Sequence, residues 1–315
     1  MSLNGISELI EKLTARGART VALQFPEGLK RKAGEYARAL HDTGFSVIVS
    51  GDPCYGACDL ALETLASADV LVHFGHAPVD NQPRVIFEPY RVDFDPSVLE
   101  KALPLLSRHT IGLVTTVQHV HLIPAMEAYL RSRGFDSRVA PGSGRTPHPG
   151  QVLGCCFTAA KIPGAEEILF VGTGVFHPVG MALTTGLNVI ALDPLAGTAE
   201  EVSSEALRRK RFAVMEKARG AKSVGIIVST KQGQQRMELA RHLASLSPDA
   251  VIVTMREVSP DELLNLGFGC YVNTACPRLA YDDQVRFPVP VLSPQEFEII
   301  CGRRNWDEYA IDEIP

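Results

Sequence analysis

Residues 20–29, TVALQFPEGL, join a short apolar run to a polar loop that contains a proline and a glycine. The same order recurs further along the chain as TIGLVTTVQHVH (110–121) and SVGIIVSTKQGQ (223–234). Short β-branched runs that alternate with amphipathic stretches are typical of parallel α/β folds. The recurrence at domain length predicts that one small α/β repeat is present three times.

Each repeat is predicted to continue with a helix, a second strand, a further helix and a third strand that ends in another loop. The predicted strands are TVALQF (20–25), SVIVS (46–50), VLVHF (70–74), TIGLVTT (110–116), EILFVG (167–172), NVIAL (188–192), SVGIIVS (223–229), AVIVTM (250–255) and CYVNTA (270–275). The loops after the third strands are HFGHAP (73–78), VGTGVFHP (171–178) and VNTACP (272–277).

These repeats predict three similar parallel-sheet α/β domains, at residues 1–103, 104–218 and 219–315. Functional loops follow the carboxyl ends of parallel strands, so we expect the three sets of loops to face one centre around a pseudo-threefold axis. The alternative is a pair of Rossmann-like domains. No G-x-G-x-x-G follows an early strand, and GTGVFHPVG (172–180) lacks the dinucleotide spacing, which argues against a nicotinamide site.

The 315-residue composition is that of a soluble globular protein, with 45% hydrophobic and 21% charged residues. A net charge of −5 offers no general attraction for nucleic acid, and RRKRF (208–212) is interpreted as a solvated helix face. No apolar run approaches the roughly 20 residues that span a bilayer. Residues 1–13 are predicted to begin an amphipathic helix with no signal-peptide core, so we expect a cytoplasmic protein without membrane or nucleic-acid partners.

The chain has seven cysteines, an odd number that cannot pair completely within the molecule. In a reducing compartment they are expected to be metal ligands, reactive thiols or buried small residues. No C-x2-C pair is present, which argues against a zinc ribbon or finger. Cys54 and Cys58 match half of the C-x3-C-x2-C motif of radical enzymes that use S-adenosylmethionine, but its third position is Ala61.

The placement of the cysteines is more informative than their spacing. Cys58, Cys155 and Cys276 fall one in each repeat, in loops that follow predicted strands. This placement predicts that they bind one 4Fe–4S cluster at the junction of the domains, with one iron left open for substrate. The alternative is that they are ordinary buried thiols. Cys54, Cys156, Cys270 and Cys301 are assigned to the core, although Cys54 and Cys156 are close enough to replace their neighbours.

Several motifs resemble those of one known family. YGACD around Cys58, QVLGC at Cys155 and ACPRL at Cys276 are similar to the three cysteine motifs of archaeal diphthamide synthase. QFPEGL, HFGHAP, TTVQH, GTGVFHPVG and TKQGQ also match, so the resemblance covers residues 20–300. It implies a homodimer of three-domain subunits that cleaves S-adenosylmethionine with a 4Fe–4S cluster and an external electron donor. The 3-amino-3-carboxypropyl group would pass to a histidine of translation elongation factor 2, with release of 5′-methylthioadenosine.

Other side chains in the same loops are candidates for holding S-adenosylmethionine. The carboxylate of the ligand is expected to bind Arg278, Lys231 and the loop of Gly172, Thr173 and Gly174. The further candidates are His177, Gln118, His119 and Gln234, with Glu27 and Asp59 as groups that orient them. The structural alternatives are that His177 caps a strand end and that Arg278 pairs with Asp282 or Asp283.

Two other functions are also compatible with three cysteines in a triplicated α/β chain. A quinolinate synthase-like enzyme also combines a triplicated α/β fold with three cysteines around a 4Fe–4S cluster, but would not use S-adenosylmethionine. A non-catalytic iron–sulfur subunit would hold a cluster without turning over substrate alone. Release of methylthioadenosine by the purified chain separates the predicted transferase from both.

Overall fold

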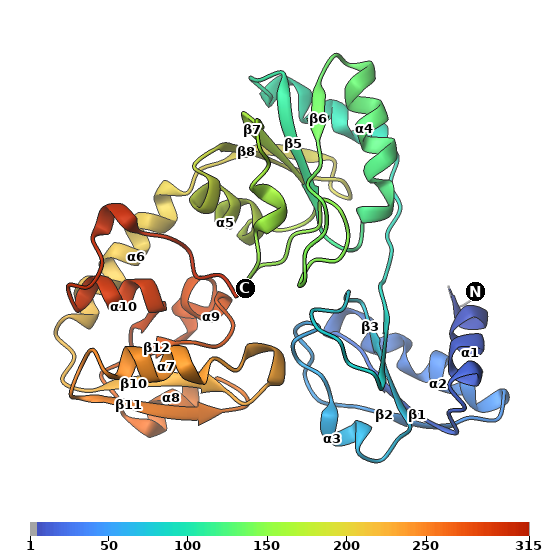
Figure 1. The fold of residues 1–315 in the computed structure, drawn as a ribbon, viewed down its shortest axis with the longest axis horizontal. Helices are drawn as coiled ribbons and strands as arrows, with labels where there is room; N and C mark the ends of the chain where they lie inside the picture. The colour runs from blue at the N-terminus through green and yellow to red at the C-terminus, as the bar shows by residue number, and fades with distance from the viewer. Residues whose placement is uncertain (1–4, 315) are drawn as a thin grey trace. The chain divides into compact units, whose positions relative to one another are not determined.

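The computed structural model describes residues 5–314, which contain three β-sheets of the same basic plan. The chain divides into two compact units, the first ending at Val92 and the second beginning at Asp93. The first unit contains one sheet and the second contains the other two. Figure 1 shows the order of the elements along the chain.

The first compact unit is a four-stranded parallel sheet in the order β2-β1-β3-β4. Its elements are α1 (Ile6–Ala15), β1 (Thr20–Gln24), α2 (Ala33–Asp42), β2 (Ser46–Val49), α3 (Leu62–Leu65), β3 (Val70–Phe74) and β4 (Val85–Glu88). The helices α1 and α2 bury leucine and tyrosine side chains, including Leu13, Tyr36 and Leu40, against β1 and β3. The predicted N-terminal helix begins at Ile6, and residues 1–4 of that prediction lie outside the described residues.

The second compact unit begins with a five-stranded sheet in the order β6-β5-β7-β8-β9. Its elements are β5 (Thr110–Thr115), α4 (Ile123–Ser132), β6 (Asp136–Arg138), β7 (Glu167–Val171), α5 (Phe176–Thr185), β8 (Asn188–Asp193) and β9 (Thr198–Val202). The strands are parallel except β9, which pairs antiparallel with β8. The extra strand β9 is therefore an addition to the plan of the first sheet.

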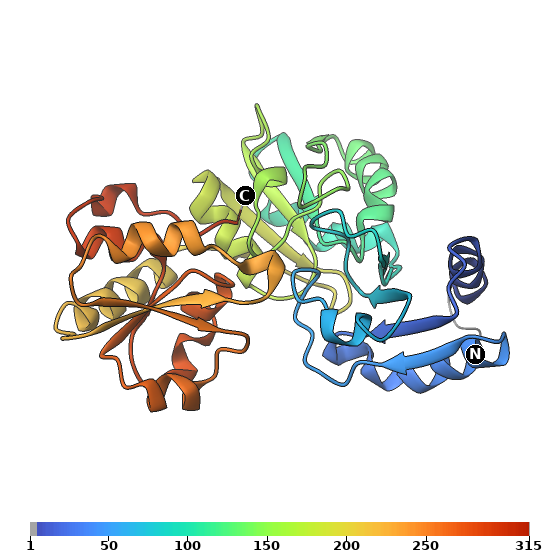
Figure 2. The same ribbon diagram turned by 60° about the horizontal axis from the view of Figure 1, so that its bottom comes forward.

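The third sheet has the order β11-β10-β12-β13 and is again parallel. Its elements are α6 (Glu205–Ala218), β10 (Val224–Ser229), α7 (Met237–Ala244), β11 (Ala250–Met255), α8 (Pro260–Leu266), β12 (Cys270–Asn273), α9 (Arg278–Tyr281), β13 (Val291–Leu292) and α10 (Pro294–Ile300). Side chains of α6, α7 and α10 share one core with β10 and β12, while Leu263 of α8 packs with Ile227 and Tyr271 on the other face. Figure 2 shows helices on both sides of this sheet.

The same strand order confirms that one α/β repeat is present three times. In each sheet the first strand lies between the second and the third, and the fourth strand follows the third. The predicted strands are all present, and the alternative of a Rossmann-like pair is wrong because there are three sheets. The strands β4, β6, β9 and β13 were not predicted. Within the described residues, no helix has the length and apolar content needed to cross a bilayer.

One prediction about the surface holds only in part. RRKRF (208–212) lies on α6, but Arg211 is only 1% exposed. Its guanidinium donates to both carboxylate oxygens of Glu296, at 2.7 and 2.5 Å, and to the carbonyl oxygens of Ala280 and Val291. The run is therefore solvated on one side only, and Arg211 joins α6 to α10.

Candidate functional site

The loop between β2 and α3 presents the first predicted cysteine ligand. Cys58 is half-buried in this loop, whereas Cys54 is only 2% exposed. Gln24, the last residue of β1, donates from Nε2 to the carbonyl oxygen of Asp59 at 2.7 Å, and its Oε1 accepts from the backbone N–H of Ala61 at 3.1 Å. This buried amide therefore fixes the chain directly after Cys58.

Two histidines at the end of β3 adjoin the same loop. His73 Nδ1 lies 2.8 Å from Gln24 Oε1, and His73 Nε2 lies 2.9 Å from His76 Nδ1. Burial lowers the pKa of His73 from 6.5 to about 3 and that of His76 to about 4, because a charged imidazole is costly away from water. Both rings are therefore neutral at pH 7. The pair was not predicted, although the sequence signal for it is present in the two histidines, three residues apart, of HFGHAP.

The second predicted ligand, Cys155, lies in the long connection between β6 and β7. Cys155 is half-buried, and its carbonyl oxygen accepts from the backbone N–H of Ile314 at 2.8 Å. The neighbouring Cys156 is buried, with Sγ 3.4 Å from Thr158 Oγ1. The two adjacent thiols therefore have different surroundings, and the motif cysteine is the more exposed of the two.

The third predicted ligand, Cys276, follows β12 and is also half-buried. Asn273 Nδ2 donates to the carbonyl oxygen of Cys276 at 2.8 Å, and Asn273 Oδ1 accepts from the N–H of Ala275 at 3.0 Å. One buried asparagine thus closes the turn that carries the cysteine. The Cys276 loop is fixed by a side chain at the end of its own strand, as the Cys58 loop is by Gln24.

Within the second compact unit, the loops of Cys155 and Cys276 lie against each other. A Cβ on Gly154 would meet the ring of Phe176 at 2.9 Å and Cδ of Arg278 at 3.6 Å, so glycine permits the close approach. The Arg278 guanidinium lies 5.3 Å from the centroid of Phe176 and 2.8 Å from Asp282. The predicted pairing with Asp282 is therefore confirmed, and Arg278 lies between the two cysteine loops.

His177 belongs to the same group of residues. Its ring stacks on Phe170 at a centroid distance of 5.7 Å. Burial, together with the positive charge of Arg278, lowers the pKa of His177 from 6.5 to about 4. The ring is therefore neutral at pH 7, and its place on the first turn of α5 keeps it near Arg278.

The other predicted positioning residues have different environments. Lys231 is 6% exposed and pairs with Glu257 at 2.6 Å. Gln234 is buried in the short helical turn Gln232–Gln234, which begins directly after Lys231. Arg145 donates to the carbonyl oxygen of Gly233 at 3.3 Å and so connects this turn to the loop before Cys155. Glu257 and Arg145 were missed by sequence reasoning because each lies far along the chain from its partner.

The remaining candidates follow strands of the first two sheets. Gln118 and His119 follow β5, and buried His119 meets the ring of Phe94 at 5.2 Å. Gly172 is packed against Phe170, while Thr173 and Gly174 are exposed after β7. Glu27 is a surface residue that pairs with Lys30 at 2.7 Å, and this ion pair accounts for its position without a bound ligand. Buried Asp59 accepts from the N–H of Tyr55 at 3.4 Å and so orders the Cys58 loop.

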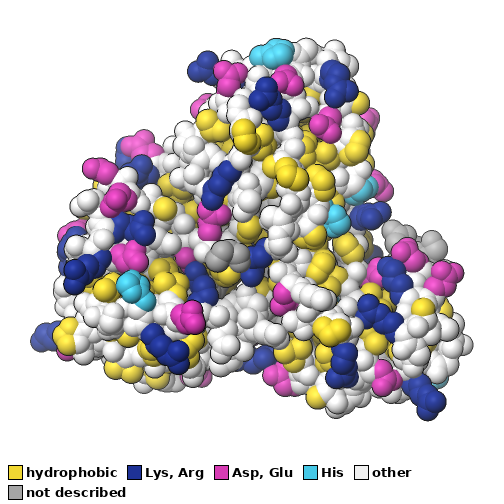
Figure 3. Space-filling model, in the orientation of Figure 1, with side chains coloured by type: hydrophobic (Ala, Val, Ile, Leu, Met, Phe, Trp, Pro, Cys, Tyr) yellow, Lys and Arg dark blue, Asp and Glu magenta, His cyan; other side chains and the backbone are white. Residues whose placement is uncertain are grey.

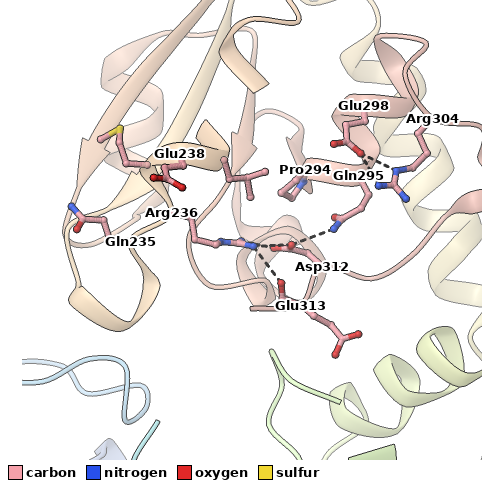
Figure 4. A pocket seen from close by; sticks show the side chains of 11 residues that line it. Gln235, Arg236, Glu238, Pro294, Gln295, Glu298, Arg304, Asp312 and Glu313 are labelled. Carbon is pink, nitrogen blue, oxygen red and sulfur yellow. Dashed lines mark hydrogen bonds and ion pairs between the residues drawn. The ribbon is translucent and has the colours of Figure 1, made fainter. Parts of the chain in front are cut away.

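A residue that sequence reasoning missed, Arg236, connects the Cys276 loop to the C-terminal segment. It donates to the carbonyl oxygens of Thr274 and Ala275, at 2.7 and 3.1 Å, and pairs with Asp312 at 2.5 Å. Figure 4 shows Arg236 and Asp312 facing each other at a pocket of about 670 Å³. None of the predicted site residues lines this pocket.

The surface carries both signs of charge. Figure 3 shows Lys and Arg side chains interspersed with Asp and Glu over the face drawn.

The repeated sheets and the three half-buried thiols in their loops define a triplicated α/β protein with one candidate ligand cysteine in each repeat. A family model for diphthamide synthesis proteins matches residues 25–311. The chain therefore belongs to the diphthamide synthesis family.

Individual relatives match nearly the whole chain. The 2-(3-amino-3-carboxypropyl)histidine synthase of Pyrococcus horikoshii is 38% identical, over 98% of this chain and 92% of that protein. Subunit 1 of the human synthase is 30% identical, over 98% of this chain and 74% of that protein. The crystal structure of Dph2 from P. horikoshii with a 4Fe–4S cluster matches with a TM-score of 0.93 at 36% identity, covering 100% of this chain and 94% of that chain.

Proposed function

We infer that the chain is a 2-(3-amino-3-carboxypropyl)histidine synthase. It transfers the 3-amino-3-carboxypropyl group of S-adenosylmethionine to a histidine of translation elongation factor 2 and releases 5′-methylthioadenosine, the first step of diphthamide biosynthesis. The observation that carries this inference is the match of the whole chain to synthases, one of which has been crystallised with a 4Fe–4S cluster.

The thiols of this chain fit such a cluster. Cys58, Cys155 and Cys276 are half-buried and lie in loops that follow β2, β6 and β12, while Cys54, Cys156 and Cys270 are buried among other side chains. We propose that the three half-buried thiolates hold a 4Fe–4S cluster, with residues 1–103, 104–218 and 219–315 supplying one ligand each. When bound, the cluster supplies the electron that cleaves the carbon–sulfur bond of the sulfonium.

The protein groups around Cys155 and Cys276 would bind and orient the co-substrate. Arg278 carries a fixed positive charge between the two cysteine loops, which suits the carboxylate of S-adenosylmethionine. His177 is neutral at pH 7 and so does not repel the sulfonium cation. Both cations have a carboxylate partner, but the side chain of Lys231 is only 6% exposed beside Glu257, whereas that of Arg278 is 55% exposed beside Asp282. We therefore assign carboxylate binding to Arg278 and a supporting role to Lys231.

We further propose that the enzyme acts as a homodimer in the cytoplasm and receives its electron from an external donor. The resemblance to the archaeal synthase supports these proposals.

The test is a transfer assay on the purified chain. The protein is prepared without oxygen, reconstituted with iron and sulfide, reduced with dithionite and mixed with S-adenosylmethionine and archaeal elongation factor 2. The expected result is a mass gain on one histidine together with released methylthioadenosine. Cys58→Ser, Cys155→Ser and Cys276→Ser should each abolish transfer and lower the iron content, and Cys156→Ser is the matched control that should retain both.

Two outcomes would contradict different parts of the proposal, the first the activity and the second the choice of ligand. A complete cluster without cleavage of S-adenosylmethionine would exclude the transferase and favour a non-catalytic iron–sulfur subunit. Loss of iron in Cys156→Ser but not in Cys155→Ser would leave the function standing and move the ligand by one residue. The quinolinate synthase-like alternative is not supported, because the family match is to diphthamide synthesis proteins.

A further inference from the structure

A second group of ligand-type side chains lies in the first compact unit, apart from the three proposed cluster thiols. One ligand atom each from Cys54, His73 and His76 lies within 4.8 Å of the other two. They come from two segments, the loop after β2 and the end of β3 with the residues that follow it. Cys58 does not belong to this group.

Contacts around the histidines fix which ring nitrogen carries the proton. Gln24 Nε2 donates to the carbonyl oxygen of Asp59, and its Oε1 accepts from the N–H of Ala61, so the amide oxygen faces His73 Nδ1. Because this oxygen can only accept, His73 Nδ1 carries the proton and Nε2 presents its lone pair toward His76. A metal-binding histidine is commonly oriented in this way by an acceptor on its other nitrogen.

His76 requires only a shift of its own proton to become a ligand. In the present arrangement His76 Nδ1 donates to His73 Nε2 at 2.9 Å. When the proton lies on Nε2 instead, Nδ1 and His73 Nε2 both carry lone pairs, and a rotation of the rings would turn these lone pairs from each other toward a shared ion. Around one zinc ion, with bonds of about 2.0–2.3 Å, such ligand atoms lie within about 4 Å of one another. At 2.9 Å the two ring nitrogens must separate by a few tenths of an ångström (about 0.5 Å) to share one zinc ion, and Cys54, whose sulfur lies within 4.8 Å of both, must approach them.

The donor set selects the kind of ion. One thiolate with two neutral imidazoles suits zinc and excludes magnesium and calcium, which take oxygen ligands. The Asp59 carboxylate acts on His76 through its negative charge, which also favours a cation at this place. Cys54 is 2% exposed and His73 is fully buried, so bulk water does not surround the ligand atoms of these two side chains.

We propose that Cys54, His73 and His76 form a zinc site separate from the cysteines of the proposed cluster. Binding removes the proton of the Cys54 thiol to solvent and forms one sulfur–zinc and two nitrogen–zinc bonds, leaving one position for water. The ion joins the loop after β2 to the end of β3 and so steadies the segment that carries Cys58. The proposal does not depend on the transferase assignment.

The first experiment uses the full chain with its cluster. Zinc content is measured beside iron, and X-ray absorption at the zinc edge reports the ligands. One zinc per chain with one sulfur and two nitrogen neighbours supports the site. Zinc surrounded by oxygen alone, meaning an adventitious ion only, or no zinc after growth and purification with zinc present, overturns it.

The second experiment removes the three thiols of the proposed cluster, so that they cannot bind the added ion. The full-length Cys58→Ser, Cys155→Ser, Cys276→Ser variant is titrated with Co²⁺, whose sulfur charge-transfer absorption and visible bands report a thiolate ligand. We expect one ion per chain, loss of the sulfur band in Cys54→Ser, and about 10–100-fold weaker binding in Gln24→Leu. His242→Gln and Cys156→Ser are controls that should bind as before. The proposal would be refuted if Cys54→Ser and His76→Gln bound Co²⁺ as tightly as the parent variant and with the same sulfur band. Circular dichroism verifies that each variant is folded.

Discussion

At the scale of single residues, burial and position together separate the cysteines of this chain. Cys54, Cys156 and Cys270 are buried, whereas Cys58, Cys155 and Cys276 are half-buried in loops. Cys301 is also half-buried, but it lies at the end of α10 and packs against the core of the third sheet. Burial raises the pKa of the Cys270 thiol to about 11, because the thiolate is costly away from water, and it also raises the pKa of Cys301. The thiolate is the form that binds metals and reacts with electrophiles.

We therefore predict a graded reactivity of the thiols in the folded, cluster-free chain. At pH 8, iodoacetamide should modify Cys58, Cys155 and Cys276 at least 10-fold faster than Cys54, Cys156 and Cys270, since buried thiols react only through opening of the fold. Mass spectrometry of timed digests measures the rates, and the same digests in guanidinium give the unfolded reference. Equal native rates for Cys155 and Cys156 would contradict the distinction on which the ligand assignment rests.

The sequence predicted the positions of these residues better than their partners. Cys58 and Cys276 follow predicted apolar strands, so their place in strand-end loops was visible from the pattern, whereas Cys155 follows the polar strand β6, which was not predicted. Arg278 and Asp282 are one helical turn apart, and their pairing was also anticipated. Lys231 pairs with Glu257 beyond the next strand, and Gln24 reaches His73 across two neighbouring strands. Such contacts depend on the order of strands in the sheet, which local sequence does not encode.

At the scale of elements, the strands that sequence reasoning missed all lie at sheet edges, although the edge strands β2 and β11 were predicted. β6 (DSR), β9 (TAEEV) and the two-residue β13 are short or polar, and β4 is brief as well. Central strands such as β7 and β10 are buried along their length and are apolar except at Glu167 and Ser229, which lie at their ends. An edge strand needs less apolar surface, so its pattern resembles that of a loop.

The buried ion pair between α6 and α10 gives a prediction about stability. Arg211→Met should lower the free energy of unfolding by about 3–5 kcal/mol, because Glu296 would keep a buried charge without its partner. Arg209→Met is the matched control, since Arg209 pairs with Glu205 on the surface of the same helix, and it should change stability by less than about 1 kcal/mol. Urea denaturation followed by circular dichroism measures both. Similar losses in the two variants would contradict the role assigned to Arg211.

A pair of glycine substitutions tests helix packing. A Cβ on Gly180 in α5 would lie 2.2 Å from the ring of Phe157, which directly follows Cys156, so Gly180→Ala should destabilise the protein by about 1–3 kcal/mol. Gly34 in α2 has open space around it, and Gly34→Ala should stabilise by about 0.5–1 kcal/mol. Thermal unfolding of both variants should therefore shift in opposite directions. A rise in melting temperature for Gly180→Ala would show that Phe157 moves aside.

At the scale of the whole molecule, the C-terminal segment ties together parts of the second compact unit that are distant in sequence. Ile314 donates its N–H to Cys155, and Glu313 accepts from the N–H of Phe157 at 2.9 Å. Asp312 pairs with Arg236, which also holds the carbonyl oxygens just before Cys276. The segment therefore links the loops of two proposed cluster ligands. Its sequence, EYAIDEIP (308–315), gave no sign of this role, because the role lies in its contacts and not in its pattern.

Arg236→Leu should release this link. Asp312 would remain buried without its partner, so we expect the free energy of unfolding to fall by about 3 kcal/mol. Hydrogen exchange should accelerate at the amides of Phe157 and Ile314, and the reconstituted chain should hold less iron because the loops of Cys155 and Cys276 are no longer fixed together. Lys161→Ala is the matched control, since it removes a partly exposed ion pair to Glu313 and should cost less than about 1 kcal/mol with iron unchanged. Loss of stability without faster exchange at Phe157 and Ile314 would mean that Arg236 supports the fold of the third sheet alone. Faster exchange with full iron content would mean instead that the thiols find the cluster without help from the C-terminal segment.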